Sequence, residues 1–274
     1  MSDSKLLVVI GLDDPLVERL RDGFRARLGE PPRFAVSASP PPIYALDGRV
    51  LAESGRVMGR WLRPDGVLYY SYFEGAADAR RALAIADTPS FPDVRDTLPL
   101  DDKVMALLAA MRDRGALATV PRGYVPAGTE VPSNGERVLK WGDAHCGEGK
   151  LRVGGAFCPE HSSVVEPFLR GESVRVLLVG SRSWQLHYAS DDWRKNVRAT
   201  VTVAAEADPD LVVEAQQVAR RLRLEVAGID FIVGVDGRRH LLEVNAYPGF
   251  DDAPGAEEAF VDLALDWWSR VAGA

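Results

Sequence analysis

The sequence predicts a mixed α/β (α+β) protein in which a small open α/β domain precedes a larger part built on antiparallel strands. Within residues 1–99, short apolar strand patterns alternate with amphipathic helix patterns, which is the order typical of an open α/β sheet. Beyond residue 170, strand patterns follow one another across tight turns, as in antiparallel hairpins. We therefore place one domain at residues 1–99 and a second at residues 100–274.

The composition indicates a folded cytoplasmic protein. The 274 residues are 46% hydrophobic, which supports a sizeable core, and the net charge of −7 gives no general nucleic-acid footprint. No apolar run approaches the roughly 20 residues of a membrane helix, and the N-terminus lacks a signal-peptide pattern. Cys146 and Cys158 could pair, but they look like thiols of a reducing compartment. We expect binding to neither nucleic acid nor membrane, and the sequence leaves a homo-oligomer open.

The N-terminal domain is predicted from five segments and one turn. Its expected elements are strands at 6–12, 33–37 and 67–73 and helices at 15–28 and 76–86. Asp47-Gly48 is a hairpin signal inside the otherwise ambiguous stretch 44–60. No Gly-rich fingerprint follows Gly11 at the end of the first strand, so we do not place a nucleotide in this domain.

The second domain begins with a helical run from Leu100 to Arg114 that follows a proline-containing linker. Two later amphipathic helices are expected to pack on the antiparallel sheet, with Trp267 and Trp268 as core anchors of the second one. The expected elements are strands at 137–140, 173–179, 183–189 and 197–203 and helices at 209–224 and 256–271.

A hairpin between Ala227 and Gly249, AGIDFIVGVDGRRHLLEVNAYPG, carries the clearest functional signal. Asp236-Gly237 predicts a two-residue type I′ turn. That turn places Asp230 directly opposite Glu243, with Asn245 on the same face. Opposed carboxylates repel unless a hard cation lies between them, and carboxylate and amide oxygens are ligands of Mg²⁺. We predict Mg²⁺ there, with Mn²⁺ as the alternative ion; the alternative interpretation is a solvated hairpin face with unrelated acids.

The aspartate, the Glu-x-Asn thirteen residues later and the following x-Pro-Gly resemble the metal-binding strands of the ATP-grasp superfamily. D-alanine–D-alanine ligases, glutathione synthetases and ribosomal-protein glutamate ligases carry this pattern. The resemblance covers roughly residues 100–250, and its features occur in the family's order. It implies the ATP-grasp fold, with a lid at about 118–170 and a core at about 171–274 that grip ATP between two antiparallel sheets.

The resemblance also implies which residues hold ATP. Two lysines would reach the phosphates, a glycine loop would close over them, and a hinge would hold the base. The residues are Lys103 and Lys140 for the phosphates, Gly147 and Gly149 in the loop, Glu166, Phe168 and Leu169 in the hinge, and Glu172 for the ribose. Taken singly, each has a plainer interpretation: a surface lysine, a flexible hairpin tip or a solvated loop acid.

Two departures from the family pattern concern the lid. Trp141 stands where the family usually has a proline after the lysine. Only sixteen residues separate Gly149 from Glu166, and Gly154, Gly155 and Pro159 leave no room for a regular helix there. We therefore expect a trimmed lid.

Arg175 and Arg194 are two cations in addition to the lysines expected to bind ATP, and they suggest a second anionic substrate. The resemblance implies that Arg175, Arg194 and Asn196 contact the transferred phosphate or a substrate carboxylate. The plainer interpretations are a salt bridge from Arg175 to a neighbouring strand, and an exposed turn at 194–196.

The function implied is an ATP-dependent carboxylate–amine ligase that forms a C–N bond through an acylphosphate and releases ADP and phosphate. Its substrates would be a carboxylate carried by an amino acid or peptide, and an amine acceptor. The alternatives are a kinase of the same fold acting on a small molecule, and a non-catalytic ATP-binding regulator.

Overall fold

The computed structural model describes residues 5–29, 31–53, 59–71, 76–100, 120–142, 149–195 and 197–273. The chain forms two compact units. The first contains Met1–Leu98, Leu224–Val226 and Pro254–Ala274; the second contains Pro99–Arg223 and Ala227–Ala253. None of the described helices is both long and apolar enough to span a membrane.

A four-stranded parallel sheet forms the centre of the first unit, with strand order β2-β1-β6-β7. All five residues of β1 are buried, as expected for an inner strand of a parallel sheet. Helix α1 begins after Asp13, whose carboxylate accepts a hydrogen bond from the N–H of Leu16 and so caps the first turn. The bounds are β1 (Leu6–Ile10), α1 (Asp14–Leu28), β2 (Arg33–Ser37), β6 (Gly66–Tyr69) and β7 (Ser90–Phe91).

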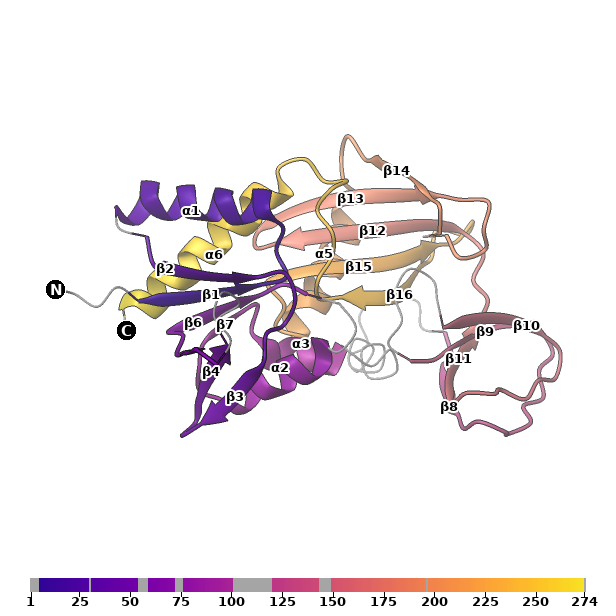
Figure 1. Cartoon of the computed structure of the whole chain (residues 1–274). Coiled ribbons are helices and arrows are strands. Elements are labelled where there is room, and N and C mark those ends of the chain that lie inside the picture. Colours follow the sequence, from indigo (N-terminus) through magenta and orange to yellow (C-terminus); the bar gives the residue numbers. More distant parts are fainter. Residues whose placement is uncertain are drawn as a thin grey trace. The chain divides into compact units, whose positions relative to one another are not determined.

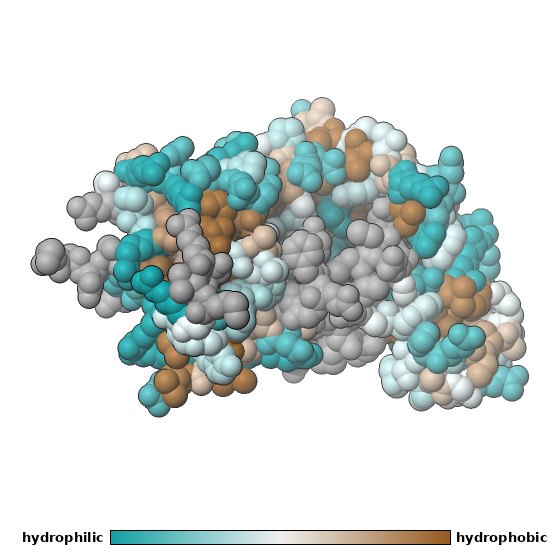
Figure 2. Space-filling view, viewed as in Figure 1, coloured by the Kyte–Doolittle hydropathy of each residue, from teal (hydrophilic) through white to brown (hydrophobic). Residues whose placement is uncertain are grey.

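A second, three-stranded antiparallel sheet in this unit contains β3 (Ile43–Leu46), β4 (Arg49–Glu53) and β5 (Trp61–Leu62). The predicted turn at Asp47-Gly48 is confirmed: both residues have positive φ, 52° and 71°, and Leu46 pairs with Arg49. Apolar side chains gather over this hairpin (Figure 2), where Tyr44 and Leu46 are exposed. The remaining helices of this region are α2 (Ala76–Ile85), α3 (Val94–Thr97) and a 3₁₀ turn at Leu98–Leu100.

The last helix, α6 (Ala256–Gly273), belongs to the first unit, so our prediction that it packs on the antiparallel sheet of the second domain is wrong. Trp268 is 1% exposed and meets the ring of Phe24 edge-on at 6.2 Å. Helix α6 can pack here because Gly66, at the start of β6, leaves room for the Trp267 ring. A Cβ at this position would lie 2.9 Å from that ring. The apolar stripe of the helix indicated burial, but it did not indicate against which sheet.

The second unit is built on two antiparallel sheets, which we call the lid sheet and the core sheet (Figure 1). Helix α5 (Pro209–Arg221) packs against β12, as predicted. The lid sheet has the order β10-β9-β11-β8, with β8 (Gly123–Val125), β9 (Glu136–Lys140), β10 (Lys150–Gly154) and β11 (Ser163–Pro167). The core sheet has the order β14-β13-β12-β15-β16, with β12 (Glu172–Val179), β13 (Arg182–Ala189), β14 (Thr200–Val203), β15 (Val226–Val233) and β16 (Arg239–Asn245).

The lid is trimmed as predicted. All residues from 149 to 167 are described, and no helix occurs among them. Cys158 is an exposed free thiol, whereas Cys146 lies outside the described residues.

The hairpin of β15 and β16 reaches the predicted pairing by a different route. Among its turn residues only Gly237 has positive φ, 73°, and the N–H of Gly234 donates to the carbonyl of Arg238 at 2.8 Å. The turn therefore has a three-residue loop with glycine in the left-handed region, and the predicted two-residue type I′ turn is wrong.

A bulge corrects the register that this longer loop sets. Val233 pairs with Arg239, and without a bulge that register would bring Asp230 opposite Leu242. The ladder shifts between Asp230 and Phe231, Leu242 becomes the extra residue, and Asp230 pairs with Glu243. The predicted pairing of the two carboxylates is thus confirmed.

Candidate functional site

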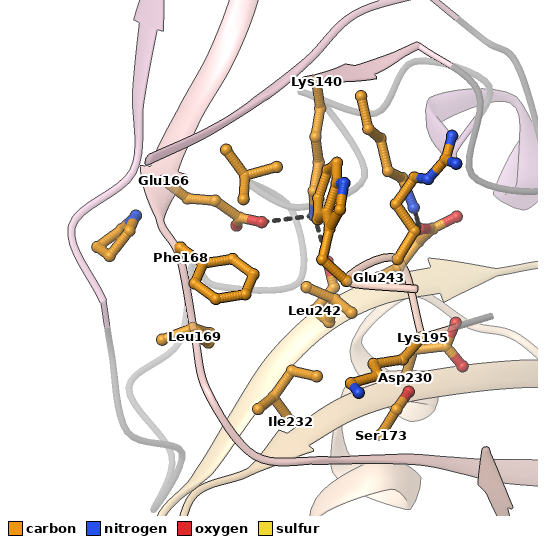
Figure 3. A pocket seen from close by; sticks show the side chains of 15 residues that line it. Lys140, Glu166, Phe168, Leu169, Ser173, Lys195, Asp230, Ile232, Leu242 and Glu243 are labelled. Carbon is orange, nitrogen blue, oxygen red and sulfur yellow. Dashed lines mark hydrogen bonds and ion pairs between the residues drawn. The ribbon is translucent and has the colours of Figure 1, made fainter. Parts of the chain in front are cut away.

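A cavity opens between the lid sheet and the core sheet within the second unit (Figure 3). Phe168, Leu169 and Ile232 lie on one side of it, and Lys195, Asp230 and Glu243 lie on the other. The cavity thus combines an apolar side with a charged side, the arrangement common in binding sites for small molecules.

The two opposed carboxylates are each neutralised by a cation of the protein itself. The guanidinium of Arg175, on β12, holds Asp230 in a bidentate ion pair at 2.6 and 2.8 Å. Lys150, on β10, lies 3.1 Å from Glu243. The amide of Asn245 donates to Asp230 at 3.3 Å, so the three predicted metal ligands do lie together. The salt bridge from Arg175 to a neighbouring strand, which was its plainer interpretation, is therefore present.

Close packing fixes the position of Arg175. Burial alone would lower the pKa of its guanidinium, but the paired Asp230 raises that pKa above its ordinary value. The guanidinium lies 5.4 Å from the centre of the Tyr188 ring, and burial raises the pKa of Tyr188. A Cβ at Gly228 would lie 3.3 Å from the Arg175 Nε, so this glycine leaves space for the arginine beside Asp230.

Glu166 contacts two cations. Its Oε1 lies 2.6 Å from the Lys140 ammonium and its Oε2 accepts from the Arg122 Nε at 2.5 Å; all three side chains are at most 4% exposed. Burial alone would raise the pKa of Glu166, but the charges and hydrogen bonds of Lys140 and Arg122 hold it below its ordinary value. Sequence reasoning missed Arg122. A carboxylate in an apolar strand does require a cation, but that signal does not say which one.

The hinge places an aromatic ring and one backbone donor at the cavity. Phe168 lines the cavity with the Arg152 guanidinium 3.9 Å from its ring centre, and its own N–H donates to the carbonyl of Glu136 at 3.0 Å. Pro167 has no N–H. The N–H of Leu169 has no hydrogen-bond partner among the described residues, so it is available to donate to a ligand in the cavity.

The structure does not bring Glu172 to the cavity. Its carboxylate lies 2.6 Å from the Nδ1 of His187, whose Nε2 is 2.9 Å from the Gln185 amide. The next residue, Ser173, lines the cavity instead. Successive side chains of a strand point to opposite faces, so Glu172 and Ser173 cannot both face the cavity.

Several solved structures resemble the chain along nearly its whole length. The ATP-grasp ligase PsnB, in complex with a phosphomimetic variant of its minimal precursor, Mg and ADP, has a TM-score of 0.60 at 17% identity, over 97% of this chain and 99% of that one. D-alanyl-alanine synthetase A from Vibrio cholerae has a TM-score of 0.62 at 13% identity, over 100% and 98%. The chain has the ATP-grasp fold.

A third solved structure that the chain resembles is the macrocyclase MdnC from Microcystis aeruginosa bound with the precursor peptide MdnA. Its TM-score is 0.61 at 12% identity, over 95% of this chain and 99% of that one. No protein-family model matches the sequence, and no curated protein matches it. The likeness therefore confirms the predicted ATP-grasp fold through structure.

The segment after β13 supplies further residues to the ATP-grasp cavity. Arg194 lines it, together with Trp193 and Lys195, which sequence reasoning missed. Arg194 pairs with Asp192 at 2.8 Å, and hydrogen bonds from the side chain and backbone of Arg194 lower the pKa of Asp192 to about 2. Other lining residues without a sequence signal are Val138, Ser173, Ile232 and Leu242.

Lys103, Gly147 and Asn196 lie outside the described residues. Gly149 is described: it has a φ of 61°, its carbonyl accepts from the N–H of Trp141 at 2.9 Å, and it directly precedes β10.

The donor set at the bulge fits a hard divalent cation. The described part of the chain holds no group of three or more His, Cys, Asp and Glu side chains able to bind a metal. Asp230, Glu243 and Asn245 instead offer two carboxylates and an amide, all of them oxygen donors. Mg²⁺ takes such ligands in small number and completes its octahedron with water and phosphate oxygens. A carboxylate oxygen that accepts one hydrogen bond still has a lone pair for a metal.

Proposed function

We propose that the protein is an ATP-dependent carboxylate–amine ligase that uses Mg²⁺. The observation that carries the proposal is the carboxylate pair Asp230 and Glu243, which lines one cavity with Lys140 in a chain of ATP-grasp fold. The cavity is lined by four basic and three acidic side chains, although the whole chain has a net charge of −7. A local excess of positive charge in an acidic protein favours an anionic ligand.

ATP would bind with its base on the apolar side and its phosphates on the charged side. The base would lie against Phe168 and Ile232, and the N–H of Leu169 would donate to its edge. Lys140 and Lys150 would hold the phosphates, because both residues line the cavity from strands of the lid sheet.

Asp230, Glu243 and Asn245 would hold Mg²⁺, and Mn²⁺ is the alternative ion. When bound, the ion supplies positive charge to the phosphoryl oxygens. Arg175 orients Asp230 through two hydrogen bonds, and Arg194 and Lys195 add charge at the same cavity.

The reaction would proceed in two displacements. A substrate carboxylate oxygen attacks the γ-phosphorus, the bond to the bridging oxygen breaks, and ADP leaves. An amine then attacks the carbonyl carbon of the acylphosphate, loses a proton and expels inorganic phosphate. Little covalent chemistry falls to the protein, which positions the reactants and stabilises charge. The lid sheet over the cavity would exclude water that would hydrolyse the acylphosphate.

A peptide or amino acid is the substrate class we favour. PsnB and MdnC were solved with precursor peptides. Both the carboxylate and the amine of this chain's reaction would then come from amino-acid or peptide groups.

A phosphate-release assay over carboxylates, amines and peptides tests the proposal. The expected products are ADP and phosphate in equal amounts, with ¹⁸O passing from a labelled carboxylate to phosphate. Glu243→Gln should abolish the release, since it removes one anionic metal ligand. Release of AMP would contradict the proposal; phosphate kept on a stable acceptor would indicate a kinase, and binding without consumption would indicate a regulator.

A further inference from the structure

Arg122, which directly precedes β8, and Lys140, the last residue of β9, contact consecutive backbone carbonyls of β16. The Nη2 of Arg122 donates to the carbonyl of Leu241, and the Lys140 ammonium donates to the carbonyl of Leu242 at 3.3 Å. Both cations also contact Glu166. The contacts close a ring, which we call the Arg122 ring: Arg122, Glu166, Lys140, Leu242 and Leu241.

The bulge makes this ring feasible. In a regular strand, successive residues turn to opposite sides, so two consecutive carbonyls would not face the same partner element. Leu242 is the extra residue of the bulge, and the carbonyls of Leu241 and Leu242 accept from Arg122 and Lys140, respectively. The same irregularity that pairs Asp230 with Glu243 therefore also seats these two cations on the core hairpin.

The charges of the ring leave Lys140 with capacity for a further anion. The ring holds two cations and one carboxylate in surroundings where each side chain is at most 4% exposed. Both Glu166 oxygens are engaged, so that carboxylate is committed to cations within the protein. An ammonium has three donors, and Glu166 and Leu242 account for two of those of Lys140.

We propose that Arg122 is a positioning residue of the nucleotide site, which acts through Glu166 and the Leu241 carbonyl to hold the Lys140 ammonium toward the phosphates. This inference rests on the proposed function, because it assigns the phosphates to Lys140. In this proposal Glu166 pairs with Lys140 and does not contact the adenine base. The base then contacts only the hinge backbone and the apolar side chains of the cavity. Loss of Arg122 then weakens binding of phosphates and leaves binding of the base unchanged.

Calorimetric titration of the full chain with Mg-ADP and with adenosine separates these two effects. Arg122→Gln should weaken Mg-ADP binding roughly tenfold, at the lower end of what loss of an outer hydrogen-bonding partner costs. Adenosine affinity should stay at the wild-type value. Arg122→Lys should fall between the two, because one ammonium cannot reproduce the two directed contacts of a guanidinium. Glu166→Gln should repeat the pattern of Arg122→Gln.

Arg238→Gln is the matched control, since it removes an exposed guanidinium from the same hairpin, where its partner is Asp236 at 3.4 Å. It should leave both affinities unchanged. Thermal unfolding of each variant checks that the fold is retained.

Hydrogen exchange of the ligand-free protein gives a readout that needs no nucleotide. Arg122→Gln should speed amide exchange in β9 and at residues 241–243, whereas Arg238→Gln should not. Equal losses for Mg-ADP and adenosine, wild-type Mg-ADP affinity in Arg122→Gln, or unchanged exchange would each overturn the inference. A wild-type protein that binds no Mg-ADP would defeat the proposed function as well, whereas a wild type that binds it beside an unaffected Arg122→Gln would defeat the inference alone.

Discussion

The buried carboxylates of the second unit differ in how they are compensated. Glu166 and Asp230 each contact cations at hydrogen-bonding distance. Glu214, on α5, is 6% exposed; its nearest cation, Arg239, is 3.4 Å away, and its Oε2 has no hydrogen-bond partner among the described residues. Burial raises the pKa of Glu214, the attraction of Arg239 lowers it, and Asp208 and Asp210 raise it further, so that it lies above its ordinary value.

Glu214→Gln should therefore stabilise the protein at neutral pH. An acid whose pKa is raised by folding favours the folded state only while it is protonated, and this benefit is lost as pH rises through the folded pKa. The melting temperature of Glu214→Gln should exceed that of the wild type at pH 7. The difference should shrink below about pH 4.3, the ordinary pKa of a glutamate, where both states are protonated.

The control for this prediction is Glu206→Gln, which removes an exposed carboxylate just before the same helix. It should change the melting temperature little at either pH. Destabilisation by Glu214→Gln at pH 7 would mean that the ion pair with Arg239 outweighs the cost of burial.

At the scale of elements, two Asp-Gly pairs show how far a turn signal can be trusted. Asp47-Gly48 forms the two-residue turn that it predicts. Asp236-Gly237 does not, because Gly234 pairs with Arg238 and the loop gains a residue. The predicted pairing of Asp230 with Glu243 still occurs, because the bulge at Leu242 offsets the extra residue of the loop. A sequence pattern gives the pairing, but not the irregularity that produces it.

Some residues of the candidate site could be predicted from the sequence, and others could not. Lys140, Asp230, Glu243 and Asn245 could be located from the sequence because they belong to one hairpin and one strand end. Arg122 could not, since its contacts with Glu166 and Leu241 join segments distant in the chain. Glu172 contacts His187 and does not line the cavity, whereas its neighbour Ser173 does, because successive side chains of a strand point to opposite faces.

Gly171, between β11 and β12, lets two elements approach closely. A Cβ there would lie 2.2 Å from the carbonyl oxygen of Val233 and 2.8 Å from the Ile232 side chain, which lines the cavity. Gly171→Ala should cost about 1–3 kcal/mol of unfolding free energy, the range of overpacking, and should lower the melting temperature.

Gly135→Ala is the matched control, because a Cβ at Gly135, directly before β9, would meet nothing within 4 Å. It should leave the melting temperature nearly unchanged. Equal stability of the two variants would show that β15 yields to the added methyl group.

At the scale of the molecule, the last segment of the chain belongs to the same compact unit as the N-terminal segment. The N-terminal unit is completed by Pro254–Ala274, so its stability depends on residues about two hundred positions away in sequence. Sequence reasoning could not find this, because the apolar stripe of α6 suits either sheet. The glycines at 23 and 66, which leave room for Leu265 and the tryptophans, become informative only once the partners are known.

Trp268→Ala should therefore destabilise the first unit. The ring is 1% exposed, and truncation of a buried aromatic side chain costs about 3–5 kcal/mol. Hydrogen exchange should accelerate in β1 and β6, while protection in β12 and β13 should stay near the wild-type value. Trp61→Ala, which removes a tryptophan that is 38% exposed in the same unit, should have a much smaller effect. Loss of protection in β12 and β13 but not in β1 would contradict the assignment of α6 to the first unit.

We propose that the cavity between the lid sheet and the core sheet binds ATP with a metal held by Asp230, Glu243 and Asn245. Calorimetric titration with a non-hydrolysable ATP analogue, with and without Mg²⁺, tests it most directly. We expect saturable binding by the wild type that is strengthened at least tenfold by Mg²⁺, the scale of an interaction worth about 1.4 kcal/mol. Glu243→Gln should lose this strengthening and keep its melting temperature. Absence of binding, or binding that Mg²⁺ and Glu243→Gln leave unchanged, would contradict the claim.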